Sequence, residues 1–270
     1  MGAVRWLPAA LVFGPVLWAE GGDNRGAPSY SAAGVVNAAS NVPGPLAPYA
    51  IASLYGSGLA YSKRAVSEKD LRANMLPTEL DGVRVLVEGS PAPLYYVSPE
   101  QINFLIPYNA GAAFPTQVKV KVILDGRHGP EVDLALRETA PALFQADGRT
   151  VIAAHGADWK PISAEAPARP GEDIVLFAAG LGRTLPNVAY PQLPREAARI
   201  ANWQRFRVLL DGAAVETWRV AYVGVTPGYA GLYQINLKLP ENLSRDPEIR
   251  IAVGEEISPE GLRLPAAAAP

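Results

Sequence analysis

The chain has 270 residues, of which 49% are hydrophobic and 19% are charged. This is enough apolar material for one large domain or two ordinary ones, and it excludes wholesale disorder. Its 24 basic and 26 acidic residues give a formal net charge of −2 at pH 7. The chain therefore lacks the excess of positive charge that is typical of nucleic-acid-binding proteins. It has no cysteine, so disulfides, thiol chemistry and cysteine-bound metal sites are excluded.

The first residues have the layout of a secretory signal peptide. Arg5 precedes an apolar stretch, 6–18, and small Ala19 is followed by polar Glu20. The stretch is broken by two prolines and is too short to cross ~30 Å of hydrocarbon, so we expect no stable membrane insertion after cleavage. We therefore predict a signal peptide, 1–19, a linker, 20–33, and a secreted, periplasmic or cell-surface location.

Four segments of the remaining chain occur twice, in the same order. They pair 35–40 with 151–156, 47–60 with 169–182, 82–107 with 205–240, and 116–126 with 246–256. Insertions lie between the paired segments, where loops tolerate them. The order predicts two copies of one domain, 34–144 and 145–265, followed by a tail, 266–270.

The periodicity within the repeated segments indicates β-strands. Valines alternate with other residues in 83–87 and 118–122, as expected of strands with one face on a core. Asp-Gly pairs, which favour turns, recur between the predicted strands, at 81–82, 125–126, 147–148 and 211–212. We therefore predict an all-β protein of two tandem antiparallel sandwiches, with only short helical turns in 67–74 and 195–202.

The tripeptide Gln-Ile-Asn occurs in both copies, at 101–103 and 234–236. The alternation points Ile102, Phe104 and Ile106 inward, together with Ile235, Leu237 and Leu239, and places the amides on the opposite face. The amides could contact a ligand, or they could bond to backbone in a neighbouring loop. We favour the second interpretation because both copies carry them.

Long motifs carry a resemblance to a known family. They include "PYAIASLYGSGLA", "GVRVLVEGSPAPLYYVSPEQINFLIP", "ARPGEDIVLFAAGLG" and "TPGYAGLYQINLKLP". From about Gly34 to its end, the chain resembles the Solibacter uncharacterised C-terminal domain family of exported acidobacterial proteins. The resemblance implies tandem immunoglobulin-like sandwiches of the IPT/TIG type, and it brings no catalytic residues with it.

Residues for catalysis are few in the sequence. His128 and His155 are far apart and lie beside predicted turns, where solvated histidines are common. The glycines of "LYGSGLA" and "FAAGLGRT" precede no helix, so they indicate bends at strand ends rather than a phosphate-binding loop. No Asp-x-Asp-x-Asp string marks a calcium loop. We assign no catalytic, cofactor or metal site, and expect no enzyme.

The aromatic residues are the most suggestive surface feature. Trp159 and Trp203 lie in polar loop contexts, and we predict them as ligand-binding residues. Exposed Trp rings stack on sugar rings and also anchor protein interfaces. Basic residues near the matching loops could hold an acidic partner, or simply be solvated; they are Lys63, Arg64, Lys69 and Arg72 in the first copy, and Arg183, Arg195, Arg199 and Arg205 in the second.

The sequence thus predicts an exported, non-catalytic module that makes structural or adhesive contacts with extracellular proteins. A carbohydrate-binding module for an extracellular polysaccharide is the first alternative. A hydrolase with acids in the groove between the domains is the second. Nucleic acid is not expected as a partner, and the sequence leaves the oligomeric state open.

Overall fold

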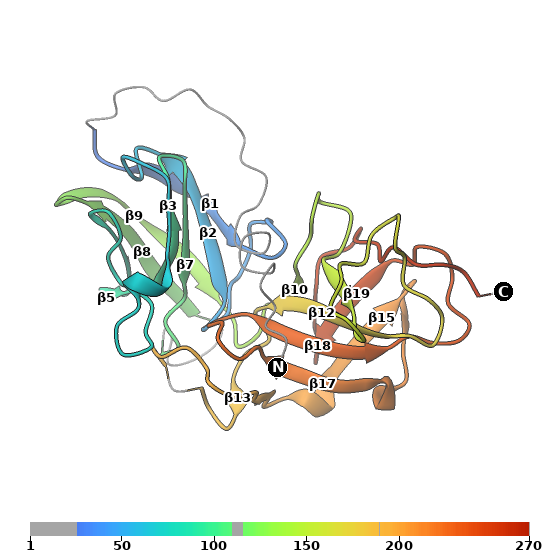
Figure 1. Cartoon of the computed structure of the whole chain (residues 1–270). Coiled ribbons are helices and arrows are strands. Elements are labelled where there is room, and N and C mark those ends of the chain that lie inside the picture. The colour runs from blue at the N-terminus through green and yellow to red at the C-terminus, as the bar shows by residue number, and fades with distance from the viewer. Residues whose placement is uncertain (1–25, 110–115, 189, 270) are drawn as a thin grey trace.

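A computed structural model of the chain describes residues 26–109, 116–188 and 190–269. Within these ranges the regular structure is strands and three single-turn 3-10 helices, without an α-helix. Figure 1 shows two sandwiches side by side, with the strands of the first running steeply in the view and most of those of the second lying across it. The predicted all-β fold of two immunoglobulin-like sandwiches is confirmed.

The first sandwich packs two antiparallel sheets against each other. One has the order β1-β2-β7-β6-β3 and the other β5-β4-β8-β9. The strands are β1 (Ser29–Asn37), β2 (Ile51–Ser57), β3 (Arg64–Ala65), β4 (Val83–Val87), β5 (Ser90–Pro91), β6 (Leu94–Val97), β7 (Gln101–Leu105), β8 (Thr116–Leu124) and β9 (Arg127–Leu136).

The second sandwich repeats this plan. Its larger sheet has the order β10-β12-β18-β17-β14-β13, with β11 also on β12, and its smaller sheet has the order β16-β15-β19-β20. The strands are β10 (Ala142–Leu143), β11 (Ala153–His155), β12 (Asp173–Ala179), β13 (Thr184–Leu185), β14 (Arg199–Ile200), β15 (Phe206–Leu210), β16 (Ala213–Ala214), β17 (Val220–Val225), β18 (Tyr233–Lys238), β19 (Ile249–Val253) and β20 (Glu256–Ile257).

The duplication extends to strand register. In the first copy Tyr96 pairs with Asn103, beside a bulge in β6. In the second copy Tyr222 pairs with Asn236, beside a bulge at the same place in β17. A bulge inserts one residue and re-aims the strand, so its presence at matched positions shows that the two domains share local geometry as well as strand order.

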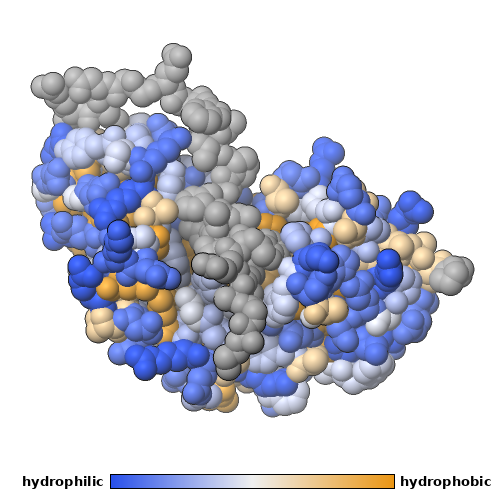
Figure 2. All heavy atoms as spheres, viewed as in Figure 1, coloured by the Kyte–Doolittle hydropathy of each residue, from blue (hydrophilic) through white to orange (hydrophobic). Residues whose placement is uncertain are grey.

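Each core is built from the inward face that the alternation predicted. Val83, Val85 and Val87 are buried, with Arg84 exposed between them. The six inward residues of the two Gln-Ile-Asn strands are each at most 1% exposed. Where the surface is visible in Figure 2, hydrophilic residues dominate both sandwiches and apolar patches are small, as expected of sheets with one face in water.

The Asp-Gly pairs form tight turns. Positive φ at both residues of 81–82, 125–126 and 211–212 matches the two-residue turns that suit the twist of paired strands. At 147–148 only the glycine has positive φ, and Asp147 instead accepts hydrogen bonds from the backbone N–H groups of Arg149 and Thr150. All four pairs therefore form turns. Three of them use positive φ at both residues, and the fourth uses hydrogen bonds to the Asp147 side chain.

Some boundaries and helical turns differ from the expectation. The predicted signal peptide, 1–19, lies outside the described residues, and β1 begins at Ser29, inside the expected linker. The expected tail begins at Ala266, which is buried and bridges Ala168. A 3-10 helix, η1 (Glu68–Asp70), lies within 67–74. In the second copy the helical prediction was wrong, since 199–200 is a strand and the helical turn, η2, is Trp203–Arg205.

The two sandwiches share one hydrophobic cluster. Tyr49, Ile51 and Leu105 of the first domain belong to the same buried cluster as the core of the second domain. The Tyr95 hydroxyl donates a hydrogen bond to the Ala230 carbonyl at 2.6 Å. Since apolar contact and buried hydrogen bonds both cross the boundary, we expect the domains to move as one body.

Tyrosine rings line the edge of this boundary. The rings of Tyr108 and Tyr190 stack with centroids 6.3 Å apart, and Tyr49 meets Tyr108 edge-on at 5.8 Å. The Tyr108 hydroxyl donates to the Asn187 side chain at 2.6 Å. Such ring pairs add to the stability of the boundary beyond their buried area.

Candidate functional site

A hollow lies at the boundary of the two domains, which we call the junction groove. It is lined by Arg137, Glu138, Thr139, Asn202, Arg205, Val253, Glu255 and Glu256, and its volume is about 430 Å³. The connector after β9, the turn before β15 and the β19–β20 turn each contribute side chains. The groove therefore exists only because the two domains are held in this arrangement.

Polar contacts hold the walls of the junction groove together. Arg137 donates to both carboxylate oxygens of Glu256, at 2.9 and 2.7 Å, across the boundary. The Asn202 side-chain amide donates to Glu138 at 3.2 Å. These side chains keep part of their hydrogen-bonding capacity, since a carboxylate accepts several hydrogen bonds and a guanidinium donates five.

A second hollow, the proline hollow, shares Arg137 and Glu256 with the junction groove. Its volume is about 230 Å³, and Pro43, Pro141 and Pro259 are among its lining residues. Val42 and Ile257, also in the lining, are 47% and 43% exposed. The ion pair is thus common to two hollows, and the second adds proline and aliphatic side chains to polar ones.

Trp203 lies next to the junction groove. Its ring is 41% exposed, and its neighbours Asn202 and Arg205 are lining residues. The Arg199 guanidinium lies over the Trp203 ring at 5.7 Å and over the Tyr222 ring at 5.8 Å. One guanidinium therefore contacts both the Trp203 ring of η2 and the Tyr222 ring of β17.

Trp159 has different surroundings. It is half-buried and packs against the second core, and its φ of 61° lies in the left-handed region. It follows β11 at one edge of the larger sheet, whereas Trp203 follows β14 near the opposite edge. The structure does not bring the two predicted residues together in one platform. Trp218, which the sequence analysis did not select, is 66% exposed with Arg219 over its ring at 4.4 Å.

The repeated amides bond to each other. Gln101 donates to the Asn103 side chain at 2.8 Å, and Gln234 donates to the Asn236 side chain at 2.7 Å. The sequence analysis favoured bonds to loop backbone, but the structure pairs neighbouring amides along each strand. Because the same pair recurs in both copies, it fits a structural role in the repeated strand.

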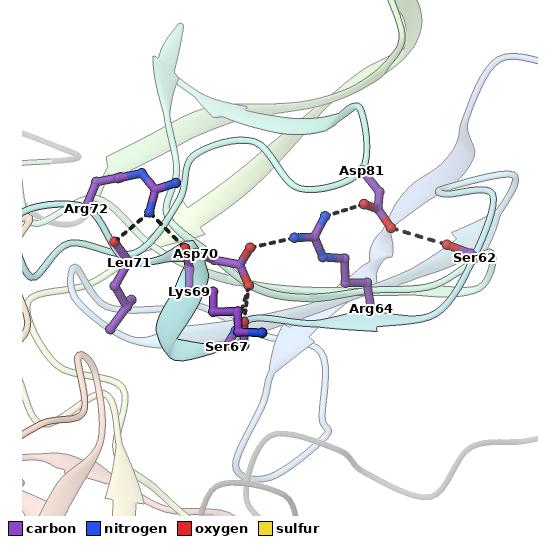
Figure 3. Close-up of polar contacts among 8 residues, drawn as sticks. All are labelled: Ser62, Arg64, Ser67, Lys69, Asp70, Leu71, Arg72 and Asp81. Carbon is purple, nitrogen blue, oxygen red and sulfur yellow. Dashed lines mark hydrogen bonds and ion pairs between the residues drawn. The ribbon is translucent and has the colours of Figure 1, made fainter.

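The basic loop of the first copy is largely engaged within itself. Figure 3 shows Arg64 between Asp70 and Asp81, with Ser67 also bonded to Asp70. These contacts, from Ser67 first and Arg64 next, hold the pKa of the Asp70 carboxyl below its usual value. Arg72 donates to the backbone carbonyls of Lys69 and Leu71. The two carboxylates offset the charge of Arg64, whereas Arg72 bonds to neutral carbonyls and keeps its positive charge.

The side chain of His155 is engaged by neighbouring residues. His155 is not solvated as expected: its Nδ1 lies 2.5 Å from Glu172 Oε1 and its Nε2 lies 3.2 Å from the Ala166 carbonyl. Both ring nitrogens therefore face structural partners rather than a nucleophile. Among residues 26–109, 116–188 and 190–269, no three His, Asp or Glu side chains gather as a metal site, and no helix could cross a membrane.

The fold and these surfaces define a two-domain immunoglobulin-like protein. No family model matches the chain, and no curated protein matches it. Similar solved structures include the surface glycan-binding protein PbSGBP-B of Prevotella bryantii, at 10% identity and a TM-score of 0.25, over 79% of this chain and 36% of that one. The mixed-linkage glucan locus protein SGBP-B of Bacteroides ovatus, solved with a heptasaccharide, has 14% identity and a TM-score of 0.28, over 77% and 35%.

The Ig1-2 module of the Drosophila receptor protein tyrosine phosphatase DLAR has 10% identity and a TM-score of 0.19, over 90% of this chain and 95% of that one. The present chain spans about a third of the length of the two glycan-binding proteins. At these TM-scores the similarities carry no argument about function, which has to come from the surfaces of this chain.

Most of the junction groove leaves no signal in the sequence. Glu138, Asn202 and Glu255 lie in a connector and in turns whose composition is ordinary, and Glu256 begins the short strand β20. Their meeting depends on how the second sandwich sits on the first, which strand periodicity does not encode. Arg205 and Trp203 were singled out for charge and aromatic character, and both lie at or beside the groove.

Proposed function

We propose that this chain is an exported, non-catalytic binding module that makes structural or adhesive contacts with proteins at or beyond the cell surface. The observation that carries the proposal is the continuous hydrophobic cluster across the domain boundary. A module that transmits or anchors contacts gains from rigidity, because no flexible joint has to be ordered when it binds. The family resemblance and the signal-peptide layout support export, and nucleic acid is not a partner in this proposal.

Recognition of a polysaccharide is a second candidate function, favoured by Trp203. Its ring is exposed and held in place by Arg199, beside a groove rich in hydrogen-bonding groups. Trp159, half-buried, would contribute through the loop it supports. The hydrolase alternative would use acids of the junction groove, but Glu256 is paired with Arg137 and Glu138 accepts from Asn202.

Binding assays separate these functions. The full chain, recovered after periplasmic expression, is tested for retention on soluble and insoluble polysaccharides and for capture of envelope proteins by cross-linking. Capture of a defined protein without retention on any polymer supports the adhesive function. Retention on one polymer, reduced by Trp203→Ala or Trp159→Ala, supports the second candidate, and release of reducing ends would revive the hydrolase. A chain that captures nothing in either assay contradicts the proposal.

A further inference from the structure

The chemistry of the junction groove indicates a neutral, hydroxyl-rich ligand. Its lining combines two guanidinium groups, three carboxylates, an amide and a hydroxyl, drawn from both domains. Glu138 and Glu255 would repel an anionic polymer, and Arg137 and Arg205 would repel a cationic one. A sugar hydroxyl, which both donates and accepts, can bond to either kind of group.

The adjoining proline hollow extends this surface along the domain boundary. Both hollows share Arg137 and Glu256, so one extended ligand can pass over the ion pair from one to the other. Val42 and Ile257 offer exposed apolar contact there. Sugar rings have polar edges and apolar C–H faces, and this combination suits two hollows whose linings mix polar groups with proline and aliphatic side chains.

A peptide strand fits this surface less well. Strand addition needs a sheet edge with several unpaired backbone groups. The edge strand beside both hollows, β20, consists only of Glu256 and Ile257. It therefore offers too little backbone for a peptide to pair with.

We infer that the junction groove and the proline hollow together bind a linear neutral polysaccharide, which lies along the boundary and contacts both domains. The inference rests on the second candidate function, recognition of a polysaccharide, and names the class of polymer and the site. The site exists only in the assembled two-domain chain, so neither sandwich alone would hold the polymer.

The test uses the full chain and a panel of neutral and uronate-containing linear polysaccharides, with binding measured by affinity electrophoresis. Arg205→Ala and Glu255→Ala each remove one exposed lining group. The matched control is the double variant Arg84→Ala and Glu79→Ala, an exposed pair 3.8 Å apart on the first sandwich. Thermal melts confirm that every variant is folded.

The expected result is retention by a neutral polymer, weakened about tenfold in each groove variant and unchanged in the control. Retention that the groove variants leave intact would overturn the site. Preference for a uronate polymer would overturn the neutral ligand class. In both cases the chain would still be a binding module. Capture of an envelope protein with no retention on any polymer overturns the ligand class but leaves the proposed function standing. If neither polymer nor protein binds, both proposals fall.

Discussion

The hydroxyl of Tyr95 and the carbonyl of Ala230 are 135 positions apart in the chain and 2.6 Å apart in space. Both residues are buried, so this bond joins the two domains away from water. Tyr95→Phe leaves the carbonyl without this partner, and we expect a loss of about 1–3 kcal/mol in the free energy of unfolding. Urea denaturation measures it. Tyr61→Phe, at an exposed ring, should change stability by less than about 0.5 kcal/mol, and equal losses in the two variants would contradict this role.

Gly231 of the second domain lies against Tyr49, Ile51 and Leu105 of the first. Its φ is +73°, and a Cβ there would stand 2.5 Å from Leu105 Cδ1 and 2.8 Å from the Tyr49 carbonyl oxygen. Gly231→Ala should therefore destabilise the chain by about 2–4 kcal/mol, through overpacking and backbone strain together. Gly228 has φ +86° with open space around it, so Gly228→Ala isolates the strain alone, at about 1 kcal/mol. Equal effects in urea denaturation would show that the boundary can relax.

The sequence predicts the fold of each domain but not the contacts between the domains. Strand periodicity, Asp-Gly turns and the ordered repeat were enough for two antiparallel sandwiches, because these signals act over a few residues. The matched bulges at Tyr96 and Tyr222 lie within repeated segments, so the duplication implied a common register. The packing of Gly231 against Leu105 is a contact between copies, and no periodicity records it. The same limit hid the junction groove, whose acids come from the connector after β9 and from the β19–β20 hairpin.

Burial of tyrosines predicts loss of stability at high pH. Burial raises the pKa of the Tyr49, Tyr95 and Tyr233 hydroxyls above the ordinary value near 10. The folded chain therefore resists their ionisation, whereas the unfolded chain ionises normally. The stability they contribute is fully present below about pH 10 and is lost as the pH rises above it. We expect absorbance at 295 nm to show exposed tyrosines titrating first and the buried group ionising together with unfolding, as followed by circular dichroism. Complete titration near pH 10 in a folded chain would contradict this.

Trp159 and Trp203 should differ in their effect on stability. Trp159 packs against the second core, so Trp159→Ala should lower the free energy of unfolding by about 1–3 kcal/mol. Trp203 is exposed and held mainly by Arg199, so Trp203→Ala should cost about 0.5–1 kcal/mol. Trp159→Phe keeps an aromatic ring against the core and should recover most of the loss. Urea denaturation of the three variants measures these values. Equal decreases in the free energy of unfolding at the two positions would mean that Trp203 is part of the core. The Trp203→Ala variant could then no longer report on binding alone.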